Sequence, residues 1–296
     1  MNYISEVTII RTLYLILSVT AAFLAFTPGS ARWLAILLLI WGSFIAVYQV
    51  VIGIDYDRSL GQHYLTVSLP IGISLTGAMV TLLAGRIKVF QFIILLGLAG
   101  VHLISLATLF SRSALIYPPI AASLVFILSI ASRRAPLNVL RQGWRILFVA
   151  LISLPFTGAI EFKQLNRLTD LSNFEDELRW RIFVEAAEHI QQSPFFGHGV
   201  DASSALIGVY SHNIFLEVAL TGGLILFMPF LAIMVIYTMS AKNIIARAEI
   251  DSTPLILLGM SLFALLQWNT SFDLLTSYVP LVLVAAIGSM TRGRFQ

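Results

Sequence analysis

Apolar residues form long runs over most of the chain, and short polar stretches separate these runs. An apolar run of about 18 residues or more predicts a transmembrane helix, because about 20 residues at 1.5 Å each cross the hydrocarbon core. About nine such spans are expected, at residues 7–27, 33–54, 64–84, 88–110, 114–131, 144–162, 212–238, 253–269 and 274–290. The pattern predicts an all-α protein, a polytopic bundle of transmembrane helices.

One long polar stretch, residues 163–211, interrupts this series and divides an N-terminal transmembrane bundle, 1–162, from a C-terminal one, 212–296. Within it, Ser172 and Glu175 have the spacing of a capping box, and Pro194 ends the helical pattern. Apolar residues recur between them at helical spacing: Leu178, Ile182, Phe183, Ala186, Ala187 and Ile190. We therefore expect an amphipathic helix on the membrane surface, with its apolar face toward lipid and Trp180 at the interface.

Composition supports the membrane assignment, since 58% of the 296 residues are hydrophobic and 11% are charged, against about 25% charged in a soluble domain. The mean hydropathy is +0.90. The net charge of +3 is explained by Lys and Arg in short loops, which are expected on the cytoplasmic side. This assignment places residues 163–211 and the N-terminus on the opposite, external side of the membrane.

Other classes of function and processing lack support. The charge pattern contains no basic stripe or stacking motif, so no nucleic-acid partner is expected. The absence of cysteine excludes disulfides and thiolate metal sites. The first apolar run is too long for a cleavable signal, and Glu6 stands where a basic region would precede one.

Polar residues concentrate where the external segment re-enters the membrane, in Ser211-His-Asn-Ile-Phe-Leu-Glu217. His212 could accept a proton as a general base, or it could cap the helix end. Asn213 and Glu217 are four residues apart and share a helix face. An ionisable group such as Glu217 in a membrane helix faces the protein interior or a watery cavity, where it could position an acceptor or pair with an arginine.

Three arginines are candidate ligands for an anionic group. Arg112 lies between Ser111 and Ser113 at a break between two apolar runs, where its guanidinium suits a phosphate or could extend to the lipid headgroups. Arg179 and Arg181 begin the predicted surface helix, where they could meet an anionic headgroup or solvate the polar face.

Glycine and histidine residues near the end of the external segment complete the candidate chemistry. Gly197 and Gly199 flank His198 and predict a tight turn; no strand precedes them, so they are not a nucleotide-binding fingerprint. No other metal-ligating residues accompany His198, and no metal site is expected. His102 lies within a predicted span, as a functional group or as a satisfied core histidine.

Together these motifs resemble the O-antigen ligase/polymerase superfamily, over about residues 100–240. Ser111-Arg112-Ser113 is similar to the family's Ser-Arg element. Arg179, Phe183 and Pro194-Phe-Phe-Gly197-His-Gly199 are similar to its Arg…Trp…Pro-x-x-Gly-x-Gly stretch, with Phe183 at the usual Trp position. His212-Asn-Ile-Phe-Leu through Thr221-Gly222 is similar to its His-Asn-x-x-Leu…Gly motif. The chain has fewer predicted spans than many members of the family.

The resemblance implies a glycosyltransferase of the bacterial inner membrane whose active site faces the periplasm. The donor would be a glycan on undecaprenyl pyrophosphate, held by Arg112 and Arg179, and His212 would take the proton of the acceptor hydroxyl, with inversion and without metal or other cofactor. The remaining substrate-binding residues are expected to be Arg181, Asn213, Glu217, Gly197 and Gly199.

The acceptor separates two activities within this family. A ligase transfers to the lipid A core, whereas a polymerase transfers to a lipid-linked repeat unit. Membrane lipid is expected to surround the protein. Outside the enzyme class, a transporter or flippase for lipid-linked sugars would use the arginines without chemistry. A structural scaffold would leave the polar cluster unexplained.

Overall fold

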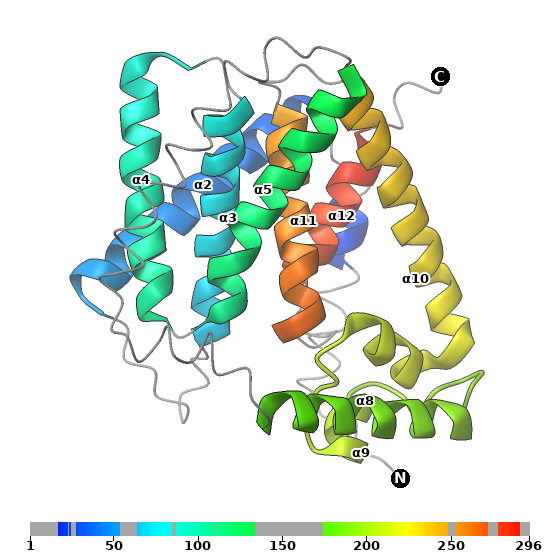
Figure 1. Ribbon diagram of the computed structural model, residues 1–296. Helices are drawn as coiled ribbons and strands as arrows, with labels where there is room; N and C mark the ends of the chain where they lie inside the picture. The colour runs from blue at the N-terminus through cyan, green and yellow to red at the C-terminus, as the bar shows by residue number, and fades with distance from the viewer. Residues whose placement is uncertain are drawn as a thin grey trace. The chain divides into compact units, whose positions relative to one another are not determined.

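The computed structural model describes residues 17–22, 24, 28–53, 64–84, 87–109, 111–133, 174–247, 253–271 and 278–290. These residues form helices and connecting turns without a strand, which confirms the predicted all-α class (Figure 1). The helices are α2 (Pro28–Val51), α3 (Tyr64–Ala84), α4 (Val89–Thr108), α5 (Arg112–Arg133), α8 (Phe174–Gln192), α9 (Ala202–Ile207), α10 (Ile214–Arg247), α11 (Thr253–Ser271) and α12 (Tyr278–Ser289).

Six of these helices, α2, α3, α4, α5, α10 and α11, are long and apolar enough to cross a membrane. The protein is therefore a multi-pass membrane protein. Helix α12 has 12 described residues and is apolar, and the first part of the predicted span 274–290, residues 274–277, lies outside the described residues. The predicted spans 7–27 and 144–162 lie mostly or wholly outside the described residues. The expected count of nine is not confirmed.

The helices group into two compact units. The first, which we call the α3 unit, contains α2 to α5, the end of α10 from Ala241, and α11 as far as Ala264. The second, the α8 unit, contains α8, α9, α10 as far as Ser240, the end of α11 from Leu265, and α12. The predicted domain borders at residues 162 and 211 stay a prediction.

Helix α3 is the core of its unit and contacts α2, α4 and α5. Glycines bring α3 and α11 close: a Cβ on Gly72 would lie 2.1 Å from the ring of Phe263, and one on Gly77 would lie 2.2 Å from the methyl of Met260. Membrane helices gain no hydrophobic drive from lipid, so small residues that permit close packing hold them together.

A polar cluster joins three helices of the same unit. His102 of α4 is buried, and its Nδ1–H donates to the Leu98 carbonyl one turn earlier. Its Nε2 lies 2.8 Å from the Ser74 hydroxyl of α3 and 3.3 Å from the Ser43 hydroxyl of α2. These contacts fit a satisfied core histidine, the second of the two interpretations that the sequence left open.

Candidate functional site

Helix α8 coincides with the predicted amphipathic segment, and part of its apolar face is buried within the protein. Ile182 and Ala186, four residues apart on one face, are buried, whereas Trp180 and Val184 are exposed. Two residues of the face that was expected to lie on lipid are therefore covered by protein, and α9 is among the elements that contact α8. Arg181 is exposed on this helix.

Helix α10 is broken near its start. Its 34 residues would extend about 50 Å if continuous, against about 30 Å for the hydrocarbon core. Gly223 has φ 55° and ψ −153°, which is not helical, and it divides a short half, 214–222, from a long half, 224–247 (Figure 1). The predicted span at 212–238 lies within this helix, and the long half alone has the length of a crossing.

The Gly-rich segment 193–199, which follows α8, fills this break with its own backbone. The amides of His198 and Gly199 donate to the carbonyls of Leu220 and Thr221, each at 2.8 Å, and the amides of Leu224 and Ile225 donate to the carbonyls of Pro194 and Phe195, at 2.8 and 3.2 Å. A helix break leaves carbonyls orphaned on one side and amides on the other. The segment satisfies both.

Gly197 lies at the centre of this contact. Its φ is +65°, and a Cβ there would lie 2.6 Å from the backbone nitrogens of both Gly222 and Gly223. Gly199 also has a positive φ, +95°, but a Cβ there would meet open space. The glycines form the expected turn, and Gly197 also permits a backbone-to-backbone approach that no other residue allows.

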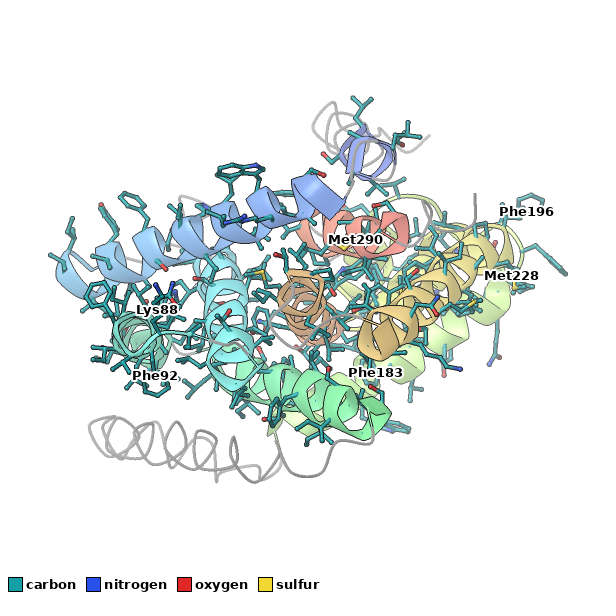
Figure 2. The ribbon with its side chains drawn as sticks, turned by 90° about the horizontal axis from the view of Figure 1, so that it is seen from above. Lys88, Phe92, Phe183, Phe196, Met228 and Met290 are labelled. Carbon is teal, nitrogen blue, oxygen red and sulfur yellow. The ribbon has the colours of Figure 1, made fainter. Side chains whose placement is uncertain are left out.

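The turn is exposed on one side and anchored on the other. Phe196 is 76% exposed and points outward, as does Met228 of the long half of α10 (Figure 2). His198 is half-buried, its Nε2–H donates to the His189 carbonyl of α8 at 2.7 Å, and the two imidazole rings meet edge to face at 5.8 Å. Among the described residues, no three metal-ligating side chains gather. The contacts of His198 are those of a structural anchor.

His212 immediately precedes the N-cap of α10 and is half-buried. Its backbone is left-handed, with φ 52°, a conformation that a non-glycine residue adopts at a cost of about 1–2 kcal/mol. Its ring lies 4.1 Å from the Tyr210 ring between centroids, and its Nδ1 lies 3.3 Å from the Thr270 carbonyl. A carbonyl only accepts, so Nδ1 carries the proton and the basic lone pair is on Nε2.

Asn213 is the N-cap of α10. Its Oδ1 accepts the amides of Phe215 at 2.9 Å and Leu216 at 3.2 Å, which satisfies two of the free N–H groups of the first turn. The side-chain oxygen of Asn213 is therefore occupied by hydrogen bonds to the backbone of α10.

Glu217 is buried one turn further along. Its two carboxylate oxygens accept the Ser203 hydroxyl at 2.7 and 2.8 Å, and Oε2 also accepts the Ser211 hydroxyl at 3.0 Å and the Ser211 amide at 3.3 Å. The carboxylate therefore ties α9 and the residue before His212 to α10.

The structure brings some of the predicted site residues together. Gly197 and Gly199 are bonded to or packed against the short half of α10, at whose start His212, Asn213 and Glu217 lie. Arg112 begins α5 in the α3 unit, and Arg179 lies on α8; the side chains of both are outside the described residues.

Three contributors to the site were not predicted from sequence. Ser203 and Ser211 donate hydrogen bonds to the Glu217 carboxylate, and the backbone carbonyl of Thr270, 58 residues further along the chain, accepts a hydrogen bond from His212 Nδ1–H. The break at Gly222-Gly223 had a local signal, the paired glycines. No sequence signal could have identified Thr270, because every residue type carries a backbone carbonyl.

Comparison with known families found a match for the segment that contains most of these residues. Residues 92–231 match the family model described as O-antigen ligase, and this segment contains the Ser-Arg element, the Gly-rich turn and the His-Asn motif. No curated protein and no solved structure matches the chain. Over residues 92–231, slightly less than half of the chain, the sequence is therefore similar to the O-antigen ligase family, which supports the resemblance to the O-antigen ligase/polymerase superfamily.

Proposed function

We propose that this protein is an inverting glycosyltransferase that transfers a glycan from undecaprenyl pyrophosphate to an acceptor hydroxyl at the periplasmic face of the bacterial inner membrane. The match of residues 92–231 to the O-antigen ligase family supports a glycosyltransferase of this general type. The observation that carries the proposal is the 3.3 Å contact between Nδ1 of His212 and the Thr270 carbonyl, which favours the neutral tautomer that has its lone pair on Nε2.

In the proposed reaction the acceptor oxygen attacks the anomeric carbon from the face opposite the leaving group. The new glycosidic C–O bond forms as the bond from the anomeric carbon to the pyrophosphate oxygen breaks, which inverts that carbon. The acceptor proton passes to Nε2 of His212, and undecaprenyl pyrophosphate leaves with the bonding electrons. General-base assistance of this kind contributes about 10²- to 10⁴-fold in rate.

Arg112 and Arg179 are proposed to bind the pyrophosphate. A guanidinium offers paired donors that match phosphate oxygens, and a fixed positive charge stabilises the negative charge that develops on the leaving group. Such a pair would take the part that a bound cation takes in other phosphate chemistry. Arg181, exposed on α8, is the third candidate for the donor.

Ligase and polymerase activity share this donor and chemistry and differ in the acceptor. The lipid A core is the proposed acceptor for a ligase, and the next lipid-linked repeat unit is the acceptor for a polymerase. The family match favours the ligase, by its description alone.

One observation favours a second candidate, a non-catalytic transporter or flippase for lipid-linked sugars. Helix α10 is discontinuous, and transporters form their binding sites with broken helices. The 193–199 segment already satisfies the two sides of this break, which argues for a structural joint. The two candidate functions differ at His212, which the glycosyltransferase needs as a general base and the transporter does not.

The test is a surface-glycan gel from a host that lacks this gene, complemented with wild type, His212→Asn or His189→Asn. Asparagine tolerates a left-handed backbone, so His212→Asn removes the base and keeps the local fold. His189→Asn is the matched control, since its ring lies in α8 against His198. The glycosyltransferase proposal is supported if only the His212→Asn cells lose the long glycan bands while the protein level is equal in all cells. Unchanged glycan bands in the His212→Asn cells would refute it.

The same gel separates the acceptors. Bare acceptor together with accumulated lipid-linked polymer indicates a ligase. Acceptor that carries a single repeat unit indicates a polymerase.

A further inference from the structure

We propose that Glu217 is a positioning residue, which holds His212 in its left-handed backbone conformation and so places Nε2 for proton transfer. This inference rests on the proposed function. It gives Glu217 a role within the protein in place of the substrate contact expected from the sequence.

The backbone of His212 needs support from its neighbours. A left-handed histidine costs about 1–2 kcal/mol, and such residues persist where the surrounding structure determines them from several sides. On the C-terminal side of His212, Asn213 is held by its capping bonds to Phe215 and Leu216. On the N-terminal side, the support is Ser211, whose amide and hydroxyl both donate to Glu217.

Glu217 is suited to this task by burial and by chemistry. Ser203, Ser211 and Glu217 are 1%, 0% and 4% exposed. Two carboxylate oxygens accept two hydroxyls and an amide, whereas a glutamine would replace one oxygen with a donor group. The position in the first turn of α10 also favours a negative charge, because the N-terminal end of a helix carries a partial positive charge.

The single hydroxyl proton of Ser211 shows why the carboxylate matters. Its Oγ lies 3.0 Å from Glu217 Oε2 and 3.0 Å from the Asn213 carbonyl, and a carboxylate oxygen is the stronger acceptor of the two. Without that acceptor the hydroxyl turns to Asn213, and the Ser211 amide loses its partner. The segment that ends at His212 is then held by α10 on one side alone.

A substrate contact for Glu217 fits these observations poorly. The carboxylate is buried, and its donors come from α9 and from the residue before His212. A sugar hydroxyl would have to displace one of them.

The experiment measures transfer by full-length protein in nanodiscs, with undecaprenyl-pyrophosphate-linked glycan as donor. The variants are Glu217→Gln and Ser203→Ala, and Ser204→Ala is the control because Ser204 is exposed on the same short helix. Misplacement of a catalytic group by about 1 Å costs about 100-fold, so we expect kcat to fall about 10- to 100-fold for Glu217→Gln. The KM for the donor should stay within about twofold, and Ser204→Ala should match wild type.

A mutant cycle with His212→Asn separates positioning from other effects. If Glu217 acts through His212, adding Glu217→Gln to His212→Asn should lower the residual single-turnover rate by less than about twofold. Additive losses would overturn the inference, as would a raised donor KM with unchanged kcat. If Glu217→Gln does not fold, the milder Ser203→Ala provides the same cycle.

The outcome also distinguishes this inference from the proposed function. Full transfer activity in the His212→Asn variant would refute both the proposed function of His212 and the positioning role of Glu217. An inactive His212→Asn beside a fully active Glu217→Gln refutes the positioning role alone.

Discussion

Gly197 and Gly223 lie backbone to backbone, so that a Cβ on Gly197 would come 2.6 Å from the Gly223 nitrogen and a Cβ on Gly223 would come 2.7 Å from the Gly197 nitrogen. A side chain on either glycine would therefore collide with the backbone of the other. The turn after α8 and the break in α10 form a single joint, which carries the short half of α10 with His212 at its start.

Gly197→Ala should unfold the joint, whereas Gly199→Ala should be tolerated better. Both substitutions place a side chain at positive φ, at about 1–2 kcal/mol, and Gly197→Ala adds an overlap worth about 1–3 kcal/mol. Thermal unfolding in detergent should show a clearly larger drop in Tm for Gly197→Ala. Equal drops would contradict the packing described for Gly197.

His198→Ala should lower stability without removing chemistry. The change deletes the Nε2–H bond to the His189 carbonyl, a loss of about 1 kcal/mol. We expect a lower Tm and a transfer rate per folded molecule within about twofold of wild type. A transfer rate as low as that of His212→Asn, at unchanged Tm, would assign His198 to the reaction.

Asn213→Ala should cost about 1 kcal/mol of stability, because the N-cap of α10 is lost, whereas Asn213→Asp should retain the cap. The two variants separate capping from substrate binding. An Asp variant that unfolds like wild type but transfers no glycan would show that the amide nitrogen of Asn213 contacts substrate.

Arg112→Ala should raise the donor KM about 10- to 100-fold, since hydrogen bonds to charged groups contribute about 1.5–3 kcal/mol. Arg112→Lys should recover part of the loss, because a lysine keeps the charge and loses the paired donors. Arg133→Ala is the control at the opposite end of α5, about 30 Å away along the helix. Steady-state kinetics with varied donor measures all three, and an unchanged KM in Arg112→Ala removes the pyrophosphate role.

His102→Leu should destabilise the α3 unit by about 1 kcal/mol, the usual strength of a hydrogen bond between membrane helices. The change removes the contacts of His102 with Ser74 and Ser43, while Ser74 keeps its bond to the Leu39 carbonyl. Transfer per folded molecule should persist. Lost transfer at unchanged Tm would instead mark His102 as functional.

Several features could be predicted from the sequence because they depend on local composition. Apolar runs require membrane helices in any tertiary arrangement, and the spans at α2 to α5 and α11 were predicted within a few residues. The positions of the Gly-rich turn and of the His-Asn pair were equally local, since glycine and capping residues specify backbone conformation directly.

The roles of the polar residues depended on the tertiary structure. The structure shows that Asn213 caps α10 and that Glu217 binds two serines, whereas the expected contact of both residues with substrate stays a prediction. Glu217 meets Ser203, 14 residues earlier in the chain, across a turn whose path the sequence does not show.

The sequence by itself determined a multi-pass helical membrane protein with a concentration of polar and glycine residues near residues 193–217. Only the tertiary structure decided that α10 is broken and filled by the Gly-rich segment, and that the Thr270 carbonyl orients His212. The physical reason is that hydropathy and turn propensity act over neighbouring residues. Hydrogen bonds between backbone groups distant in sequence depend on where the folded chain brings them, and any residue type can supply them.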